Sequence, residues 1–129
     1  MRTSAKDVVA IVDDDRRTLE SLGELLEAAG FVVRAYSSAV ALMQADGLVD
    51  IDCLISDIGM PDMNGFELRA VAAAQQPTLP VILITGRPRD AWQAPADVDP
   101  LRYFEKPYDG RKLLATITAA IADARRERS

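Results

Sequence analysis

Five short apolar runs, each followed by a segment with helical spacing, constrain the fold of this chain more than any other feature. The runs cover residues 8–12, 31–35, 53–55, 81–84 and 101–104. Three of them are rich in Val and Ile and nearly continuous, which is typical of parallel strands that are buried on both faces. The alternation therefore predicts an α/β fold, in which a five-stranded parallel sheet carries helices on both faces.

The segments between the runs repeat apolar residues at helical intervals. A stripe of leucines begins at Leu19 and stops before Gly30, a residue that suits a helix C-terminal cap. Further helices are expected over residues 37–46, 66–74 and 113–124. The connection 86–100 contains three prolines, so only a short or distorted helix over about 89–94 fits there before Pro95 stops it.

Length and composition indicate one soluble globular domain. The chain has 129 residues, of which 49% are hydrophobic and 27% are charged, so it can form a core. We expect a single domain over 1–129, with a core of about 7–122 and a charged helix end over 123–129. No apolar run approaches the ~20 residues of a membrane span, and the expected location is therefore the cytoplasm.

The charge balance and the missing histidine exclude several functions. A formal net charge of −5 argues against direct nucleic-acid binding by this domain, since a phosphate backbone attracts clustered Lys and Arg. The chain contains no histidine, which excludes a Ser-His-Asp triad, histidine-ligated zinc and a phosphohistidine carrier. The single cysteine, Cys53, excludes an intramolecular disulfide and is expected in the core.

Polar side chains cluster where the predicted strands end. Asp13, Asp14 and Asp15 follow the first run, and the others are Asp57 after the third, Thr85 after the fourth and Lys106 after the fifth. Ligands of open parallel sheets bind at the carboxyl ends of the strands, so these groups are expected to converge. Two carboxylates ~4 Å apart repel each other by about 1–4 kcal/mol, which favours a bound cation. An oxygen-only set suits Mg²⁺, and a carboxylate can serve as a nucleophile toward phosphorus.

Each of these residues also has an ordinary structural explanation. An acidic run after a strand often caps the next helix, and Asp15 is expected to do so. A single lysine such as Lys106 is most often solvated, and a single threonine such as Thr85 is often only a strand residue. Only the combination at one edge of one sheet favours a functional site.

At these positions the sequence resembles the response-regulator receiver family. The similar segments are 11–15, 54–65, 81–86 and 103–108, which occur in the family's order and together span nearly the whole chain. Details around the Pro and Tyr residues look most similar to receivers of nitrogen-fixation-type transcription regulators. The resemblance implies a flavodoxin-like, doubly wound (βα)5 fold with strand order 2-1-3-4-5.

The resemblance also implies a role for each site residue. Asp57 would be the phosphoacceptor, assisted by Lys106 and Thr85. Thr85 and Tyr103 would form the switch, and the Lys106–Pro107 peptide bond would be cis. The implied Mg²⁺ ligands are Asp13, Asp14, Asp57 and the backbone carbonyl of Gly59.

By the same resemblance, the domain is a phosphorylation-dependent signalling switch of a two-component system. A sensor histidine kinase or phosphotransfer protein would supply the phosphoryl group. The surface of the fourth helix, fifth strand and last helix would then control a downstream protein or a missing output domain, with a phosphorylation-dependent dimer as one form. The domain would not be an enzyme beyond its own phosphorylation and dephosphorylation at Asp57.

Several glycines and one tryptophan call for separate predictions, because they depart from the family pattern, shape the loop after Asp57 or have two alternative roles. Gly59 and Gly86 leave the expected phosphoryl site uncrowded, which predicts a short-lived phosphorylated state. Gly65 is expected to allow an unusual backbone angle in the loop after Asp57. Trp92 could anchor a partner or lie in the core. 

Two rival functions remain. The first is a haloacid-dehalogenase-type phosphatase, which would require Thr where the chain has Arg17. The second is a degenerate receiver that binds partners without phosphorylation.

Overall fold

Five parallel strands form one sheet in the order β2-β1-β3-β4-β5. The structure is a computed structural model and describes residues 6–86 and 95–128. The strands are β1 (Val8–Val12), β2 (Val32–Tyr36), β3 (Cys53–Asp57), β4 (Val81–Thr85) and β5 (Tyr103–Glu105). The predicted fold class and strand order are therefore confirmed. The carboxyl ends of all five strands lie at one edge of the sheet, because every neighbouring pair is parallel.

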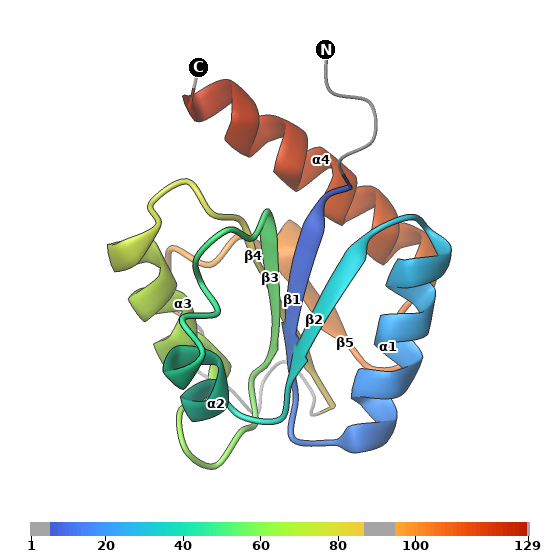
Figure 1. The fold of residues 1–129 in the computed structure, drawn as a ribbon, viewed down its shortest axis with the longest axis vertical. Helices are drawn as coiled ribbons and strands as arrows, with labels where there is room; N and C mark the ends of the chain where they lie inside the picture. The colour runs from blue at the N-terminus through green and yellow to red at the C-terminus, as the bar shows by residue number, and fades with distance from the viewer. Residues whose placement is uncertain (1–5, 87–94, 129) are drawn as a thin grey trace.

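Helices cover both faces of the sheet (Figure 1). They are α1 (Arg16–Ala28), α2 (Ala39–Gln44), α3 (Gly65–Gln75) and α4 (Gly110–Arg128), and a 3₁₀ turn, η2 (Pro100–Arg102), precedes β5. In Figure 1, α2 and α3 lie on one side of the strands, and α1 lies on the other side with α4. Among the described residues, no helix has the length and apolar character needed to cross a membrane.

Side chains of alternate residues in each central strand pack into two separate hydrophobic clusters, one on each face of the sheet. In β1, Ala10 and Val12 face the cluster that contains Leu42 of α2 and Leu68 of α3. The neighbouring residues of β1, Val9 and Ile11, face the second cluster. That cluster also contains Leu22 and Leu26 of α1 together with Leu113, Ile117 and Ile121 of α4. The two-residue period of the strands thus explains why β1 is apolar along its whole length.

Local capping residues fix where the first three helices begin. The side chains of Asp15 and Ser38 accept hydrogen bonds from the backbone at the starts of α1 and α2. Asn64 and Glu67 form a reciprocal capping box at the start of α3. Gly30 follows α1 with a φ of +97°, in agreement with the predicted C-terminal cap.

The predicted strand over 101–104 is wrong at its beginning. Leu101 belongs to η2 and is 78% exposed, whereas β5 starts at Tyr103. Asp99 accepts a hydrogen bond from the Leu101 N–H at 2.9 Å, and Pro100 opens the turn. This local capping outweighs the apolar character of Leu101. The short helix expected over 89–94 and the side chain of Trp92 lie outside the described residues.

An ionic cluster joins α4 to the amino ends of the strands. Arg125 forms a hydrogen-bonded ion pair with Asp7, and its guanidinium nitrogen also lies 3.8 Å from Oδ1 of Asp52. The other oxygen of Asp52 accepts a hydrogen bond from the Val8 N–H at 2.8 Å. The contact with Asp7 raises the pKa of Arg125 above its ordinary value. These contacts lie at the end of the sheet opposite to Asp57.

Candidate functional site

An open depression of about 320 Å³ lies at the carboxyl ends of β1, β3, β4 and β5. The residues that line it come from segments far apart in the chain. They are Asp13, Asp14, Asp15, Asp57, Gly59, Thr85, Gly86 and Lys106. Six of them, Asp13, Asp14, Asp57, Gly59, Thr85 and Lys106, are site residues predicted from the sequence, whereas Gly86 was expected only to leave the site uncrowded and Asp15 to cap the next helix. The parallel topology therefore brings the predicted polar groups together.

Three carboxylates form the acidic part of the depression. One oxygen each from Asp13, Asp14 and Asp57 lies within 4.8 Å of the others. Asp13 and Asp57 are only 4% and 9% exposed, whereas Asp14 is exposed to solvent. Burial of two like charges beside a third is costly without a compensating cation. The donor set is all oxygen, which fits a hard divalent ion such as Mg²⁺ better than a transition metal.

Lys106 supplies the positive charge of the depression. Its ammonium nitrogen lies 3.0 Å from Oδ2 of Asp13 and 3.8 Å from Oδ1 of Asp57. The backbone N–H of Lys106 donates to the carbonyl of Thr85 at 2.8 Å, which fixes the end of β5 beside β4. The peptide bond between Lys106 and Pro107 is cis, as the resemblance implied.

The surroundings shift the proton affinities of Asp57 and Lys106 upward. Burial, followed by the charge of Asp13, raises the pKa of Asp57 to about 6, although Lys106 opposes this change. Burial alone would lower the pKa of Lys106. The hydrogen bond and the charge of Asp13 outweigh burial, so the pKa of Lys106 is raised. The ionised form of Asp57 is therefore destabilised by its surroundings, and a cation placed beside it would stabilise that form.

The loop after Asp57 packs closely against the end of β3. The N–H of Gly59 donates to the Asp57 carboxylate, and the N–H of Gly65 donates to the Ile58 carbonyl at 3.0 Å. A Cβ atom on Gly65 would stand 2.8 Å from the backbone oxygen of Asp57. The unusual backbone angle expected at Gly65 is wrong, because its φ is not positive. Glycine is required there by close approach of two backbone segments.

Thr85 and Tyr103 occupy neighbouring strand ends. Thr85 is 1% exposed at the end of β4, where it lines the depression. Tyr103 opens β5 and is 8% exposed, with its side chain in the cluster of α2 and α3. The register pairs Leu83 with Tyr103 and Thr85 with Glu105, so Thr85 and Tyr103 lie on adjacent strands two residues apart along the sheet.

Two polar contacts were not predicted from the sequence. The Lys106 ammonium donates to Oγ1 of Thr18, on the first turn of α1, at 3.5 Å. Asp62, in the loop after Asp57, accepts a hydrogen bond from the Val40 N–H at the start of α2 at 3.0 Å, which lowers the pKa of Asp62. Thr18 and Lys106 are 88 residues apart in the chain, and no local sequence pattern signals their contact.

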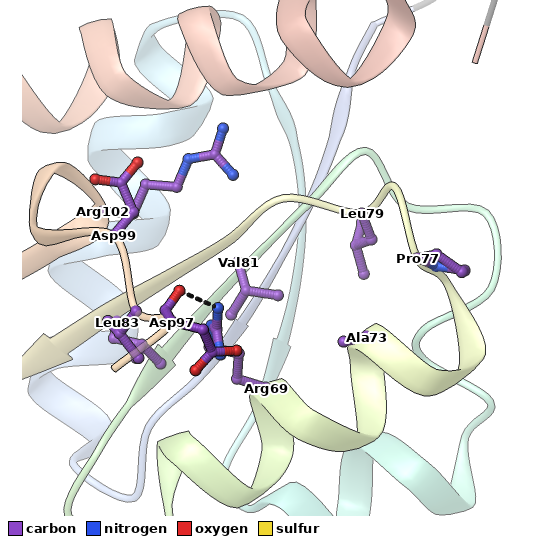
Figure 2. Close-up of a pocket in the computed structure, with 10 residues that line it drawn as sticks. Arg69, Ala73, Pro77, Leu79, Val81, Leu83, Asp97, Asp99 and Arg102 are labelled. Carbon is purple, nitrogen blue, oxygen red and sulfur yellow. Dashed lines mark hydrogen bonds and ion pairs between the residues drawn. The ribbon is translucent and has the colours of Figure 1, made fainter. Parts of the chain in front are cut away.

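A second depression, of about 240 Å³, lies between α3 and the segment before β5 (Figure 2). Its floor contains Val81 and Leu83 of β4. The Arg69 guanidinium donates to the carboxylate and the backbone oxygen of Asp97 at 3.1 and 2.9 Å. Charges there are largely offset, and no group of carboxylates converges as at Asp57. The first depression is therefore the better candidate for chemistry.

Comparison with known proteins identifies the family. The response regulator receiver domain family matches residues 9–118. The transcriptional regulatory protein FixJ of Bradyrhizobium diazoefficiens is 32% identical over 94% of this chain and 60% of its own length. The response regulator protein TmoT of Ectopseudomonas mendocina is 32% identical over 90% of this chain and 53% of its own length. The chain thus spans a little over half the length of these relatives.

Solved structures agree with the sequence comparison. A CheY-like receiver domain protein from Methanospirillum hungatei has a TM-score of 0.79 at 29% identity and covers 95% of this chain and 99% of its own. Full-length FixJ from B. japonicum has a TM-score of 0.76 at 31% identity, over 94% of this chain and 60% of its own. The chain belongs to the response regulator receiver domain family of two-component signalling.

Proposed function

We propose that Asp57 is the phosphoacceptor of a phosphorylation-dependent switch. The observation that carries this proposal is the convergence of Asp13, Asp14 and Lys106 on the buried carboxyl end of β3, where Asp57 lies. In the reaction, an Asp57 oxygen attacks the phosphorus of a phosphohistidine, the N–P bond breaks, and the released imidazole takes a proton. The product is an acyl phosphate on Asp57.

Asp13, Asp14 and Asp57, with the backbone carbonyl of Gly59, are the proposed Mg²⁺ ligands. When bound, the ion would supply positive charge that neutralises the carboxylates and the incoming phosphoryl oxygens. One carboxylate oxygen from each of the three aspartates lies within 4.8 Å of the other two, which supports one shared ion. Asp13 already accepts hydrogen bonds from Lys106 and from the Asp15 N–H, and this orients its carboxylate toward the depression.

Lys106, Thr85 and Tyr103 are proposed to respond to the phosphoryl group. The ammonium of Lys106 stands 3.8 Å from Asp57 and would pair with a phosphoryl oxygen there. The hydroxyl of Thr85 would donate to another phosphoryl oxygen, because Thr85 lines the same depression. Movement of Thr85 would alter the space available to Tyr103 on the adjacent strand, which supports a coupled pair.

The partners are proposed from the family. A sensor histidine kinase or a phosphotransfer protein would donate the phosphoryl group. The response would appear on β5, α4 and the fourth helix expected from the sequence, which lies outside the described residues. This surface would control a downstream protein, an output domain or a phosphorylation-dependent dimer. Partial coverage of FixJ and TmoT supports an output domain in a longer protein. We further propose that residues 1–129 form one cytoplasmic domain that acts in signalling, without turnover of external substrates.

Labelling with acetyl phosphate and Mg²⁺ tests the phosphoacceptor. The wild-type chain is expected to gain one base-labile phosphoryl group, detected by intact mass, whereas Asp57→Asn gains none. Asp62→Asn is the matched control, because Asp62 lies in the same loop but does not line the depression, and it is expected to label normally. Labelling of Asp57→Asn would refute the assignment. Absence of labelling in the wild type would favour the degenerate receiver, and turnover of small phosphomonoesters would favour the phosphatase.

A further inference from the structure

The strand β2 presents a free backbone edge. It pairs with β1 only, and no other strand of residues 6–86 and 95–128 lies on its outer side. The Val32 N–H donates to Asp7, and the Tyr36 carbonyl accepts from Asp13, so these two residues bond toward β1. Alternate residues of a parallel strand bond on opposite sides. The N–H and C=O groups of Val33 and Ala35 therefore face the open edge.

A groove of about 520 Å³ runs beside this edge, between β2 and α1. Its apolar walls are Leu19 and Gly23 of α1 and the side chains of Val33 and Ala35. The residues whose side chains line the groove are thus the same residues whose backbone groups face outward. The strand β2 is at the edge of the sheet, and α1 packs against it. Open backbone groups and an apolar groove therefore lie together, as in sites where an extended peptide adds a strand.

Gly23 is unusual in the wall of this groove. A glycine in the middle of a helix costs about 1 kcal/mol relative to alanine. The backbone of Gly23 does not need a positive φ, and an added Cβ would meet only Val33 Cγ1, at an ordinary distance of 3.9 Å. Neither backbone conformation nor crowding therefore accounts for this glycine. Its effect is to leave space in the groove for a side chain from outside.

The rim of the groove is acidic. Glu20, Glu24 and Glu27 lie along it on α1, and Arg16 is its one basic lining residue. Arg16 is paired with Glu20 at 3.6 Å, with both side chains largely exposed. Within the described part of the chain, Glu24 and Glu27 form no ion pair. The rim thus has two uncompensated negative charges, and it favours a positively charged occupant.

We propose that this groove, defined by Leu19, Gly23, Val33 and Ala35, binds an extended basic segment of a partner protein. The segment pairs its backbone with Val33 and Ala35, places a small apolar side chain at Gly23, and places lysine or arginine near Glu24 and Glu27. This binding does not depend on the proposed chemistry at Asp57.

The probe is a short synthetic peptide with serine at every second position, valine at the central intervening position and lysine at the intervening positions on either side, because only alternate side chains of an added strand face α1. Its binding to the full 129-residue chain is measured by fluorescence anisotropy and by backbone amide NMR. We expect the amide signals of Val33 and Ala35 to shift and to become protected from hydrogen exchange. A peptide with glutamate in place of lysine, and a peptide with alternate N-methylated amides, are both expected to bind at least tenfold more weakly, a loss of about 1.4 kcal/mol.

Protein variants complete the test. The double variant Glu24→Gln and Glu27→Gln, and the groove-filling Gly23→Leu, should each weaken peptide binding about tenfold or more. Gly23→Leu improves helix propensity, so the fold is retained. Glu127→Lys at the exposed end of α4 is the control for net charge and should bind normally. Unchanged affinity in Gly23→Leu, or amide shifts confined to other strands, would overturn the proposal. Protection of β2 amides that depends on protein concentration without peptide would assign the edge to a second copy instead.

Discussion

The ammonium of Lys106 lies closer to Asp13, at 3.0 Å from Oδ2, than to Asp57, at 3.8 Å from Oδ1. Lys106 therefore places a positive charge on the Asp13 carboxylate, which is also a proposed ligand of the divalent ion. The phosphoryl group, in contrast, would be attached to Asp57, which lies farther from the Lys106 ammonium than Asp13 does. The Lys106 side chain is therefore expected to weaken the binding of Mg²⁺ and to strengthen the binding of the phosphoryl group.

The variant Lys106→Met separates these two effects. Loss of the ammonium should raise the affinity for Mg²⁺, by up to about tenfold, because one competing cation is removed from Asp13. It should lower the affinity for beryllofluoride, which mimics the phosphoryl group. Isothermal titration calorimetry measures both, with the exposed Lys112→Met as the control. An unchanged Mg²⁺ affinity would show that Lys106 does not compete at Asp13.

The pH dependence of stability should differ between the wild type and Asp57→Asn. The pKa of Asp57 is raised from 3.8 to about 6 in the folded protein. Between these values the folded state holds a proton that the unfolded state has lost, so stability falls as pH rises through this range. The cost above it is at most about 3 kcal/mol. In metal-free buffer, Asp57→Asn should be more stable near neutral pH and equal to the wild type below about pH 4.

Urea denaturation of both proteins across this pH range checks the prediction. Addition of Mg²⁺ near neutral pH should stabilise the wild type and have little effect on Asp57→Asn, because the variant lacks one of the proposed ligand charges. A stability difference that does not change with pH would rule out the titration of Asp57 as its cause.

Gly65→Ala should destabilise the fold. An added Cβ would stand 2.8 Å from the Asp57 oxygen and 2.9 Å from the Ile58 Cα, and both of these are backbone atoms. Relief of such overlap typically costs about 1–3 kcal/mol. Gly86→Ala is the matched control, because its Cβ would lie 3.9 Å from the Lys106 Cδ, an ordinary contact. Thermal unfolding should show a lower Tm for Gly65→Ala only.

Gly86→Leu should lengthen the lifetime of the phosphorylated state. Gly86 lines the open depression beside Asp57, and a bulky side chain there would restrict the approach of water to phosphorus. The measurement is the decay of labelled protein after removal of acetyl phosphate, with Gly86→Ala as an intermediate case. Equal decay rates in all three proteins would mean that the open space at Gly86 does not control hydrolysis.

The sequence predicted the strands, the helix faces and the convergence of the site because each depends on local periodicity or on strand direction. Asp13, Asp57, Thr85 and Lys106 all stand at strand ends, and parallel pairing places those ends together. The features that the sequence could not predict depend on tertiary contacts. The close approach of Gly65 to Asp57 and the contact of Thr18 with Lys106 join residues that no short-range pattern relates. Leu101 was misplaced because one capping aspartate changed the local conformation.

The ion pairs of Arg125 with Asp7 and Asp52 stand at the opposite end of the sheet from Asp57. A five-residue strand such as β3 spans roughly 16 Å, and two unit charges at that distance interact by only about 0.3–1 kcal/mol for effective dielectric constants of about 80 to 20. A charge gained at one end therefore has a weak effect at the other. Mutations around Arg125 could adjust how firmly the domain holds together while the response to its signal stays the same, so robustness and signalling are free to evolve separately.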